Sequence, residues 1–208
     1  MFLERIAVHR DRFAAAKNVL ELGGGQCWGA CVIKRLWPGA QVCSSDISEH
    51  AVASAFKWEH QLQVKLDHTF HCRSYELPLE SESVDLVFAF QSAHHFRAHR
   101  RTLAEVYRVL RPGGSCLYLH EPTCRAFLHG LAHWRVNRKR PHVPEDVLVF
   151  SRLMALGRAA GFESSWVHDL TLTKRAPFEL LYYLALSKLP LLRDVLPATK
   201  DLVFAKPR

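Results

Sequence analysis

The chain has 208 residues, of which 49% are hydrophobic and 23% charged, and it carries a formal net charge of +8. This length suffices for a single α/β domain over residues 1–208 with a substantial core. No uninterrupted apolar run reaches the roughly 20 residues of a membrane span, and the six scattered cysteines lack the paired spacing of a metal site. Residues 1–5 contain no signal-peptide core, so a cytoplasmic location is expected.

Hydrophobic patterning predicts alternating helices and strands. Pro38-Gly39 ends the second helix, and Ser48 is typical of the N-cap of the third. The expected elements up to residue 121 are, in chain order, a helix at 2–16, a strand at 17–22, a helix at 27–37, a strand at 40–45, a helix from 48 to about 63, strands at 66–72 and 84–90, a helix at 99–110 and a strand at 115–120.

A proline-glycine turn separates the helix at 99–110 from the strand that follows it. Pro112 presets φ at the second turn position, and Gly113 accepts a positive φ at the third. After residue 121 the pattern loosens. The elements expected there are a basic, irregular segment at 122–145, a helix at about 146–160 that ends at Gly161, a strand within 162–172, an apolar helix at 178–186 and an edge strand at 201–205.

The alternation of strands and helices predicts a doubly wound parallel sheet of the α/β class. In such a sheet ligands bind outside the carboxyl ends of the strands. Several polar segments follow directly after expected strands, and we expect them to meet at that edge. They are the glycine turn at 23–25, Asp46, residues 73–76, residues 91–95 and Glu121.

Three consecutive glycines, Gly23, Gly24 and Gly25, follow the first strand and precede a helix. A backbone without β-carbons makes a tight turn on which a bulky ligand can lie, so a nucleotide-type ligand is expected. The dinucleotide fingerprint fails because Trp28 occupies its third glycine position, and the P-loop pattern is absent. A carboxylate at Asp46, about 20 residues on, suits the two hydroxyls of a ribose.

Several blocks occur in an order and spacing that carry a family resemblance. They are Val19-Leu20-Glu21-Leu22-Gly23-Gly24-Gly25, Asp46, residues 77–87 followed by His94-His95-Phe96, residues 105–114, and Ala159-Ala160-Gly161-Phe162. Together they resemble class I S-adenosylmethionine-dependent methyltransferases, the broad group that includes quinone-biosynthesis methyltransferases. The resemblance implies a Rossmann-like, mostly parallel seven-stranded sheet with an antiparallel edge strand near the C-terminus. It is dense from 17 to 121 and thin afterwards.

The resemblance also implies a cofactor site for S-adenosylmethionine, with S-adenosylhomocysteine as the product. Glu21 and the main chain of the glycine turn would face the amino-acid end, and Asp46 would take the ribose. The remaining positions implied are Ile47 and Tyr75 beside the adenine, Ser74 as an adenine contact, and Ala89, Phe90 and Gln91 near the methionine portion. Two residues depart from the family pattern: Cys27 replaces the third glycine, and Arg73 replaces an aspartate that would face the adenine.

The implied reaction is in-line methyl transfer to a small molecule. For a hydroxyl acceptor, His95 is the candidate general base, with His94 beside it, because an ordinary histidine is mostly neutral at pH 7. Glu121 either orients the substrate or makes a helix-start or salt-bridge contact. The segment 122–145 and the helix at 176–195 are expected to roof the pocket, with Arg138, Lys139 and Arg140 meeting an anionic group on the acceptor.

Two other functions stay open at this stage. The departures at Cys27 and Arg73 allow a catalytically degenerate binding or scaffold protein with the same fold. The positive charge alone suggests a nucleic-acid methyltransferase, but no aromatic residue is interleaved in the basic run at 135–140, so nucleic acid is not favoured. The acceptor and the oligomeric state cannot be derived from the sequence.

Overall fold

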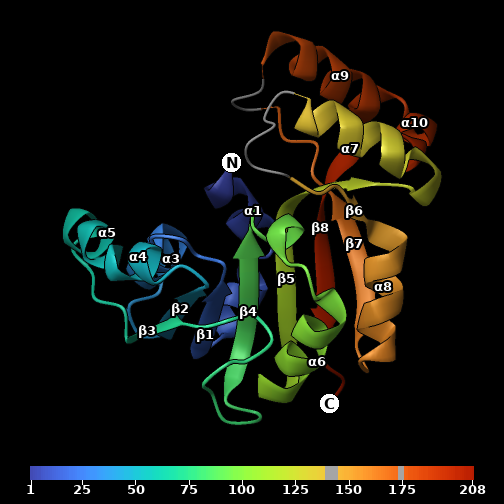
Figure 1. Cartoon of the computed structure of the whole chain (residues 1–208). Coiled ribbons are helices and arrows are strands. Elements are labelled where there is room, and N and C mark those ends of the chain that lie inside the picture. The colour runs from blue at the N-terminus through green and yellow to red at the C-terminus, as the bar shows by residue number, and fades with distance from the viewer. Residues whose placement is uncertain (139–144, 173–175) are drawn as a thin grey trace.

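A central β-sheet organises the computed structural model, which describes residues 1–138, 145–172 and 176–208 (Figure 1). Its strands are β1 (Asn18–Leu22), β2 (Gln41–Asp46), β3 (His68–His71), β4 (Val84–Phe90), β5 (Leu110–Cys124), β6 (Leu148–Val149), β7 (Glu163–His168) and β8 (Ala198–Ala205). Seven of them follow the order β3-β2-β1-β4-β5-β8-β7, and the two-residue β6 pairs with β5. The five strands from β3 to β5 in this order are mutually parallel, as the sequence predicts.

The C-terminal strand β8 is antiparallel to both of its neighbours, which confirms the expected change of direction. It lies between β5 and β7, however, so β7 forms the outer edge and the expectation of an edge position for residues 201–205 is corrected. The reason lies in the sequence of β8, where Leu202, Val203 and Phe204 are all buried. A strand that is apolar on both faces belongs inside a sheet covered on both sides.

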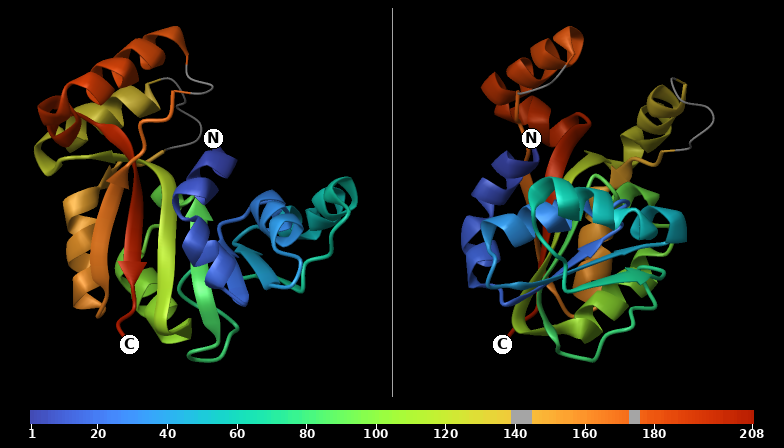
Figure 2. Two further views of the ribbon diagram at one scale, coloured as in Figure 1. Left: turned by 180° about the vertical axis from the view of Figure 1, so that it is seen from behind. Right: turned by 90° about the vertical axis from the view of Figure 1, so that its left-hand side faces the viewer.

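The helices form two layers, one on each face of the sheet (Figure 2). One core lies under α1, α2, α3 and α5, and the other lies under α6 and α8. The helices are α1 (Phe2–Val8), α2 (Arg10–Ala15), α3 (Trp28–Leu36), α4 (Glu49–Ala53), α5 (Ala55–Leu62), α6 (His99–Val109), α7 (His129–Asn137), α8 (Phe150–Ala159), α9 (Pro177–Lys188) and α10 (Pro190–Val195), with the short 3₁₀ helices η1 (Ala93–His95) and η2 (Ala126–Leu128).

Several expectations about helices need correction. The helix expected at 2–16 is divided at His9 into α1 and α2, and the helix expected at 176–195 is divided at Leu189 into α9 and α10. The helix from Ser48 is divided at Ser54 into α4 and α5, although Ser48 does cap it by accepting a hydrogen bond from the Ala51 amide at 3.2 Å. The expected irregular segment at 122–145 contains the end of β5 and the helix α7, and α8 begins at Phe150 because β6 precedes it. The sequence of α7 shows no amphipathic period, since histidines and a glycine interrupt its apolar residues, which explains why the pattern did not indicate a helix.

The roof of the molecule consists of α7, α9 and α10, which lie beyond the carboxyl ends of β4 and β5 (Figure 1). Seen from the side, α7 and α9 project as two separate arms from that same end of the sheet (Figure 2). The roof covers the edge at which an α/β sheet binds its ligands.

A buried ionic network ties the N-terminal helices to the sheet. Arg5 on α1 donates to Asp169 at 2.7 Å and to Asp201 at 3.0 Å, and His9 contacts the same oxygen of Asp201 at 2.8 Å. His120 pairs with the other oxygen of Asp169. Both carboxylates are fully buried, so each depends on these partners for compensation of its charge.

Candidate active site

The turn between β1 and α3 is built from residues with a left-handed backbone. Gly23 has φ of +64° and Gly25 of +54°. A β-carbon at Gly24 would lie 2.3 Å from the Ser44 hydroxyl, so this position accepts only glycine. A β-carbon at Gly25 would meet nothing within 4 Å, which means that the turn presents bare main chain to open space. Such a turn at the carboxyl end of a strand is suited to a ligand that lies directly on the backbone.

Glu21 lies beneath this turn. Its buried carboxyl accepts hydrogen bonds from the Ala30 amide at 3.0 Å and the Ser44 hydroxyl at 2.7 Å. Burial raises the pKa of Glu21 to about 7, and the hydrogen bond from Ser44 opposes that rise. The Glu21 side chain thus connects β1, β2 and α3, and its carboxyl packs against Gly24 of the turn.

Asp46 ends β2 and joins the glycine turn to the next loop. One carboxylate oxygen accepts from the Gly25 amide and the other from the Ser48 amide, both at 2.8 Å. Ile47 follows and is 69% exposed, so it adds an apolar side chain to the surface beside Asp46. Asp46 and Ile47 thus put a half-buried carboxylate and an apolar side chain next to the bare glycine turn.

The loop after β3 forms the other side of this region. The Ser74 hydroxyl bonds to Thr102 at 2.8 Å, and the Arg101 guanidinium lies 3.9 Å from the centre of the Tyr75 ring. Arg73 is folded along its own loop, where it pairs with Glu76 at 3.6 Å. Cys27 is fully buried, with its sulfur 3.7 Å from the Gly25 carbonyl oxygen. Cys27 therefore stays out of the space over the turn, and Arg73 has an ion-pair partner on its own loop.

Of the residues predicted for the end of β4, only Gln91 is exposed, while Phe90 is half-buried. Gln91 is exposed and has φ of +50°, whereas Ala89 is fully buried in the core. The Phe90 ring packs against Phe2 at 4.7 Å between ring centres. The structure therefore brings Gln91 to the edge and leaves Ala89 and Phe90 as packing residues.

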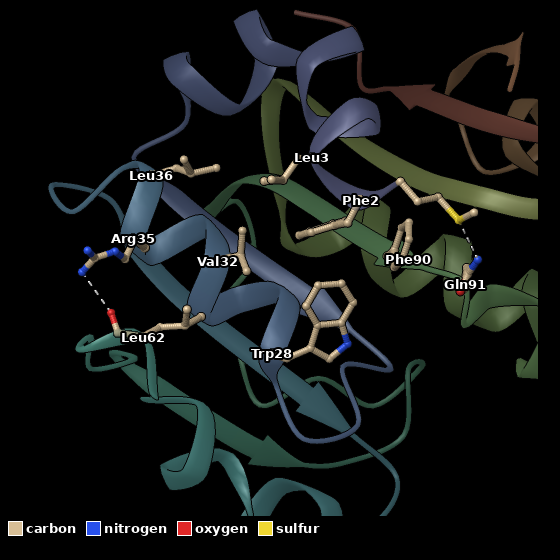
Figure 3. A pocket seen from close by; sticks show the side chains of 10 residues that line it. Phe2, Leu3, Trp28, Val32, Arg35, Leu36, Leu62, Phe90 and Gln91 are labelled. Atoms are coloured by element: carbon tan, nitrogen blue, oxygen red, sulfur yellow. Dashed lines mark hydrogen bonds between the residues drawn. The ribbon is translucent and has the colours of Figure 1, made fainter. Parts of the chain in front are cut away.

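An apolar groove of about 530 Å³ begins at Gln91 and runs between α1 and α3 (Figure 3). Trp28, Val32 and Leu36 form one wall from α3, with Phe2 and Leu3 facing them, as Figure 3 shows. At its near end the Gln91 amide reaches the Met1 sulfur at 3.5 Å. The sequence pattern does not indicate this groove, because the groove depends on how α1 packs against α3.

A larger cavity of about 730 Å³ lies under the roof and shares Gln91 with the groove. Its floor comes from the ends of β4 and β5, and its walls come from α7 and α9. The lining residues are Gln91, His94, His95, His120, Pro122, Thr123, Ala132, Arg135, Val136, Glu145, Val147, Glu179, Tyr182, Tyr183, Pro197, Ala198 and Thr199.

Glu121 is the acid at the end of β5, and it holds η1 in place. Its fully buried carboxylate accepts from the amides of Ser92 and Ala93 at 2.9 Å each, and from the amide of His94 at 3.2 Å. A fourth contact, at 2.7 Å, comes from Nδ1 of the His94 ring. Four donors saturate a carboxylate, and Glu121 does not line the cavity. Of the two roles considered for it, the geometry supports the helix-start and salt-bridge contact.

His94 and His95 both line the cavity, with ring centres 4.1 Å apart. A carboxylate only accepts, so Nδ1 of His94 carries the proton that it shares with Glu121, and Nε2 is the nitrogen left for the cavity. Burial and the neighbouring His94 lower the pKa of His95, which keeps its ring neutral at pH 7. The sequence pattern favoured His95 as the candidate base and did not indicate that His94 is the ring anchored on Glu121.

The cationic side chain that reaches this cavity is Arg135, on α7. Arg138 instead lies exposed, with its guanidinium 5.4 Å from the centre of the Trp134 ring. Lys139 and Arg140, the other two residues expected to meet an anionic acceptor, lie outside the described residues. Within the described ranges no group of three or more His, Cys, Asp or Glu side chains could hold a metal ion, and no helix is long and apolar enough to cross a membrane.

Comparison with known proteins identifies the fold. Residues 20–118 match the family model described as "Methyltransferase domain". The whole chain superimposes on the YcgJ protein of a Bacillus species with a TM-score of 0.70, 17% identity and coverage of 99% of both chains. The strand order, the bare glycine turn and these matches define a Rossmann-like methyltransferase fold.

Two groups of curated methyltransferases contain relatives similar in sequence to this chain. The demethylmenaquinone methyltransferase of Thermus thermophilus is 28% identical over 169 residues, which cover 71% of this chain and 75% of the relative. A phthiotriol/phenolphthiotriol dimycocerosates methyltransferase of Mycobacterium ulcerans is 34% identical over 55% of this chain. The match spans only 36% to 40% of the length of such mycobacterial relatives. Over residues 20–118, just under half of its length, the chain is similar to S-adenosylmethionine-dependent methyltransferases.

Proposed function

We propose that the protein transfers a methyl group from S-adenosylmethionine to a small-molecule acceptor bound in the cavity under the roof. The names of the relatives, a demethylmenaquinone methyltransferase and a phthiotriol/phenolphthiotriol dimycocerosates methyltransferase, support a small-molecule acceptor. The bound cofactor would supply an activated methyl group on a sulfonium, so the protein needs no covalent nucleophile of its own.

The residues at the sheet edge fit this cofactor. Gly25 leaves open space over bare main chain, and the side chain of Cys27 is buried away from it. Each oxygen of Asp46 accepts one hydrogen bond from a backbone amide and retains acceptor capacity for a ribose hydroxyl. The exposed Ile47, with Ser74 and Tyr75 across from it, would contact the adenine. Glu21 would affect the amino-acid end of the cofactor only indirectly, by supporting the glycine turn. Ala89 and Phe90 would affect the methionine portion only by packing beneath the site.

The observation that carries the proposal is a chain of contacts from the glycine turn to the anchored histidine. The Ser92 hydroxyl donates to the Leu22 carbonyl at 3.1 Å, directly before the turn, and the Ser92 amide donates to Glu121. Glu121 in turn accepts from His94, which lines the cavity. One hydrogen-bonded segment thus places a basic ring nitrogen beside the edge where the methyl group would lie.

For a hydroxyl acceptor, His94 would act as the general base. Its Nε2 would take the hydroxyl proton while the acceptor oxygen forms the new bond to the methyl carbon. The resulting imidazolium would be stabilised by the carboxylate of Glu121 at Nδ1. His95, kept neutral by its lowered pKa, would help to orient the acceptor, and Arg135 would meet an anionic group on it.

Calorimetric titration with S-adenosylmethionine and S-adenosylhomocysteine tests cofactor binding. We expect Asp46→Ala to lose at least tenfold in affinity, about the effect of one charge-assisted hydrogen bond of roughly 1.4 kcal/mol or more. The matched control is Glu49→Ala, on the exposed side of the adjacent helix α4. If the wild-type chain gives no heat of binding at millimolar S-adenosylmethionine, the alternative of a catalytically degenerate scaffold protein is favoured instead.

Radiolabelled methyl transfer to a panel of phenols and hydroquinones tests the catalytic assignment. General-base catalysis contributes roughly 10²- to 10⁴-fold, so His94→Gln should lower kcat by about that factor while cofactor affinity is unchanged. His95→Gln should lower kcat less than His94→Gln, because the Glu121 carboxylate hydrogen-bonds to the His94 ring but acts on His95 only through its charge. Equal losses in both variants, or a larger loss in His95→Gln, would contradict the role given to His94.

A further inference from the structure

The outer faces of the roof helices are apolar. On α9, Tyr183 and Leu186 are buried toward the sheet, yet Phe178 is 89% exposed and Leu181 65% exposed on the opposite side. A helix that is apolar all round is normally buried, and soluble monomers rarely expose contiguous apolar patches. The outer face of α9 therefore lacks a covering partner within the described part of the chain.

The neighbouring roof segments share this property. On α10, Leu191 is 85% exposed. Phe127, Leu131 and Trp134 are exposed at the i, i+4 and i+7 spacing of one helical face along η2 and α7. Eleven of the nineteen exposed large hydrophobic side chains of the described residues lie in 127–134 and 178–195. The remaining eight are scattered over the rest of the molecule, so the roof is where they gather.

The charges of the roof are mainly positive. Residues 125–138 and 177–195 contain five arginine and lysine residues, against two acids. The five are Arg125, Arg135, Arg138, Lys188 and Arg193, and the acids are Glu179 and Asp194. Arg138 stacks over the exposed Trp134, and an indole with a flanking cation is the combination that favours the headgroup level of a membrane. The sequence continues this basic run through Lys139 and Arg140.

We propose that the outer faces of α7, α9 and α10 dock on an anionic lipid bilayer as a peripheral contact. Both arms of the roof project from the same end of the sheet (Figures 1 and 2), so one flat surface reaches both. Apolar side chains enter the headgroup region while the basic ones meet anionic lipids. A second copy of the chain would bring a like-charged face opposite this one, which makes the bilayer the better electrostatic match.

The docked orientation turns the end of the sheet that holds the cavity toward the lipid. An acceptor with an apolar portion could then pass from the bilayer into the cavity without crossing water. This consequence rests on the proposed function, whereas the docking itself does not. The two ideas can therefore fail separately.

Co-sedimentation of the full chain with vesicles tests the docking. We expect binding to vesicles of phosphatidylcholine with 30% phosphatidylglycerol, and at least tenfold weaker binding to phosphatidylcholine alone at the same salt concentration. The expected affinity falls between 0.05 and 0.5 M NaCl because the headgroup attraction is screened. Phe178→Asp and Leu191→Asp should each weaken binding at least tenfold, and Arg138→Glu several-fold.

The matched control is Phe56→Asp, at an exposed phenylalanine of α5 away from the roof. It should leave vesicle binding unchanged, and circular dichroism of every variant verifies folding. Equal binding by Phe56→Asp and Phe178→Asp would overturn the proposal, as would the absence of sedimentation with anionic vesicles. So would a concentration-dependent dimer that Phe178→Asp abolishes, because a second copy would then cover the face. Vesicle binding without any cofactor binding would overturn the proposed function and leave the docking intact.

Discussion

Glu21 gives the fold a specific dependence on pH. Its carboxyl is 3% exposed, and burial raises its pKa from an ordinary 4.5 to about 7. A raised folded-state pKa means that the stabilising contribution is fully present below about pH 4.5 and is lost as the pH rises through about 7. At ~1.4 kcal/mol for each unit of pKa, the free energy of unfolding should lose roughly 2–3 kcal/mol between pH 5 and pH 8 from this group alone.

Urea unfolding of wild type and Glu21→Gln at pH 5, 6, 7 and 8 isolates this contribution, because other titrating groups cancel in the difference. The amide keeps an oxygen for the Ala30 amide and the Ser44 hydroxyl but cannot ionise. Its buried NH₂ group lowers the free energy of unfolding by an amount that does not depend on pH. The prediction therefore concerns the slope of the unfolding free energy against pH. The variant should gain roughly 2–3 kcal/mol relative to wild type as the pH rises from 5 to 8.

Ser44→Ala provides a second arm of the same experiment. The hydrogen bond from Ser44 lowers the pKa of Glu21, so its removal should raise that pKa further and steepen the loss of stability with pH. In the double variant Ser44→Ala with Glu21→Gln, the added slope should vanish. A difference between wild type and Glu21→Gln that stays constant from pH 5 to pH 8 would refute the reasoning.

Two further predictions concern the N-terminal network and the glycine turn. Arg5→Ala removes the guanidinium that both buried carboxylates share and leaves each with a histidine partner, so it should cost about 3–5 kcal/mol in urea unfolding. Arg10→Ala, at an exposed position of α2, should cost under ~0.5 kcal/mol. Cys27 has φ of +63°, so Cys27→Gly should be about 1 kcal/mol more stable than Cys27→Ala by the same assay, the reverse of the order inside a helix. Equal stabilities in either pair would contradict the corresponding argument.

The sheet could be predicted because its inner strands, such as β1 and β4, are buried on both faces. Residues Val84 to Phe90 are apolar except for Asp85, and they form β4 with those same bounds. The sequence of α7 carries no comparable signal, and its helical state depends on contacts such as the Asn137 side chain with the backbone of Glu145. Local patterning predicts elements that bury a regular face, and misses those stabilised by specific tertiary contacts.

The candidate site divides in the same way. Glycines in a turn and an acid at a strand end are local features, and the structure places Gly25 and Asp46 in contact. The distinction between His94 and His95 is not local, because it depends on Glu121, which lies 27 residues away in the sequence and reaches only one of the two rings. The sequence pattern brought all three residues to the same edge, but only the structure shows which pair shares a proton.

The contact between the glycine turn and η1 gives the site a mechanical consequence. A β-carbon at Gly23 would lie 2.9 Å from the Ser92 hydroxyl and 3.1 Å from the Phe96 ring, so the turn and η1 fit against each other with no spare room. Ser92 and His94 are held by the same carboxylate of Glu121. A ligand that displaced the turn would therefore shift η1, and with it the ring of His94. Cofactor binding and the position of the base would thus be coupled through the backbone rather than through any side chain that the two sites share.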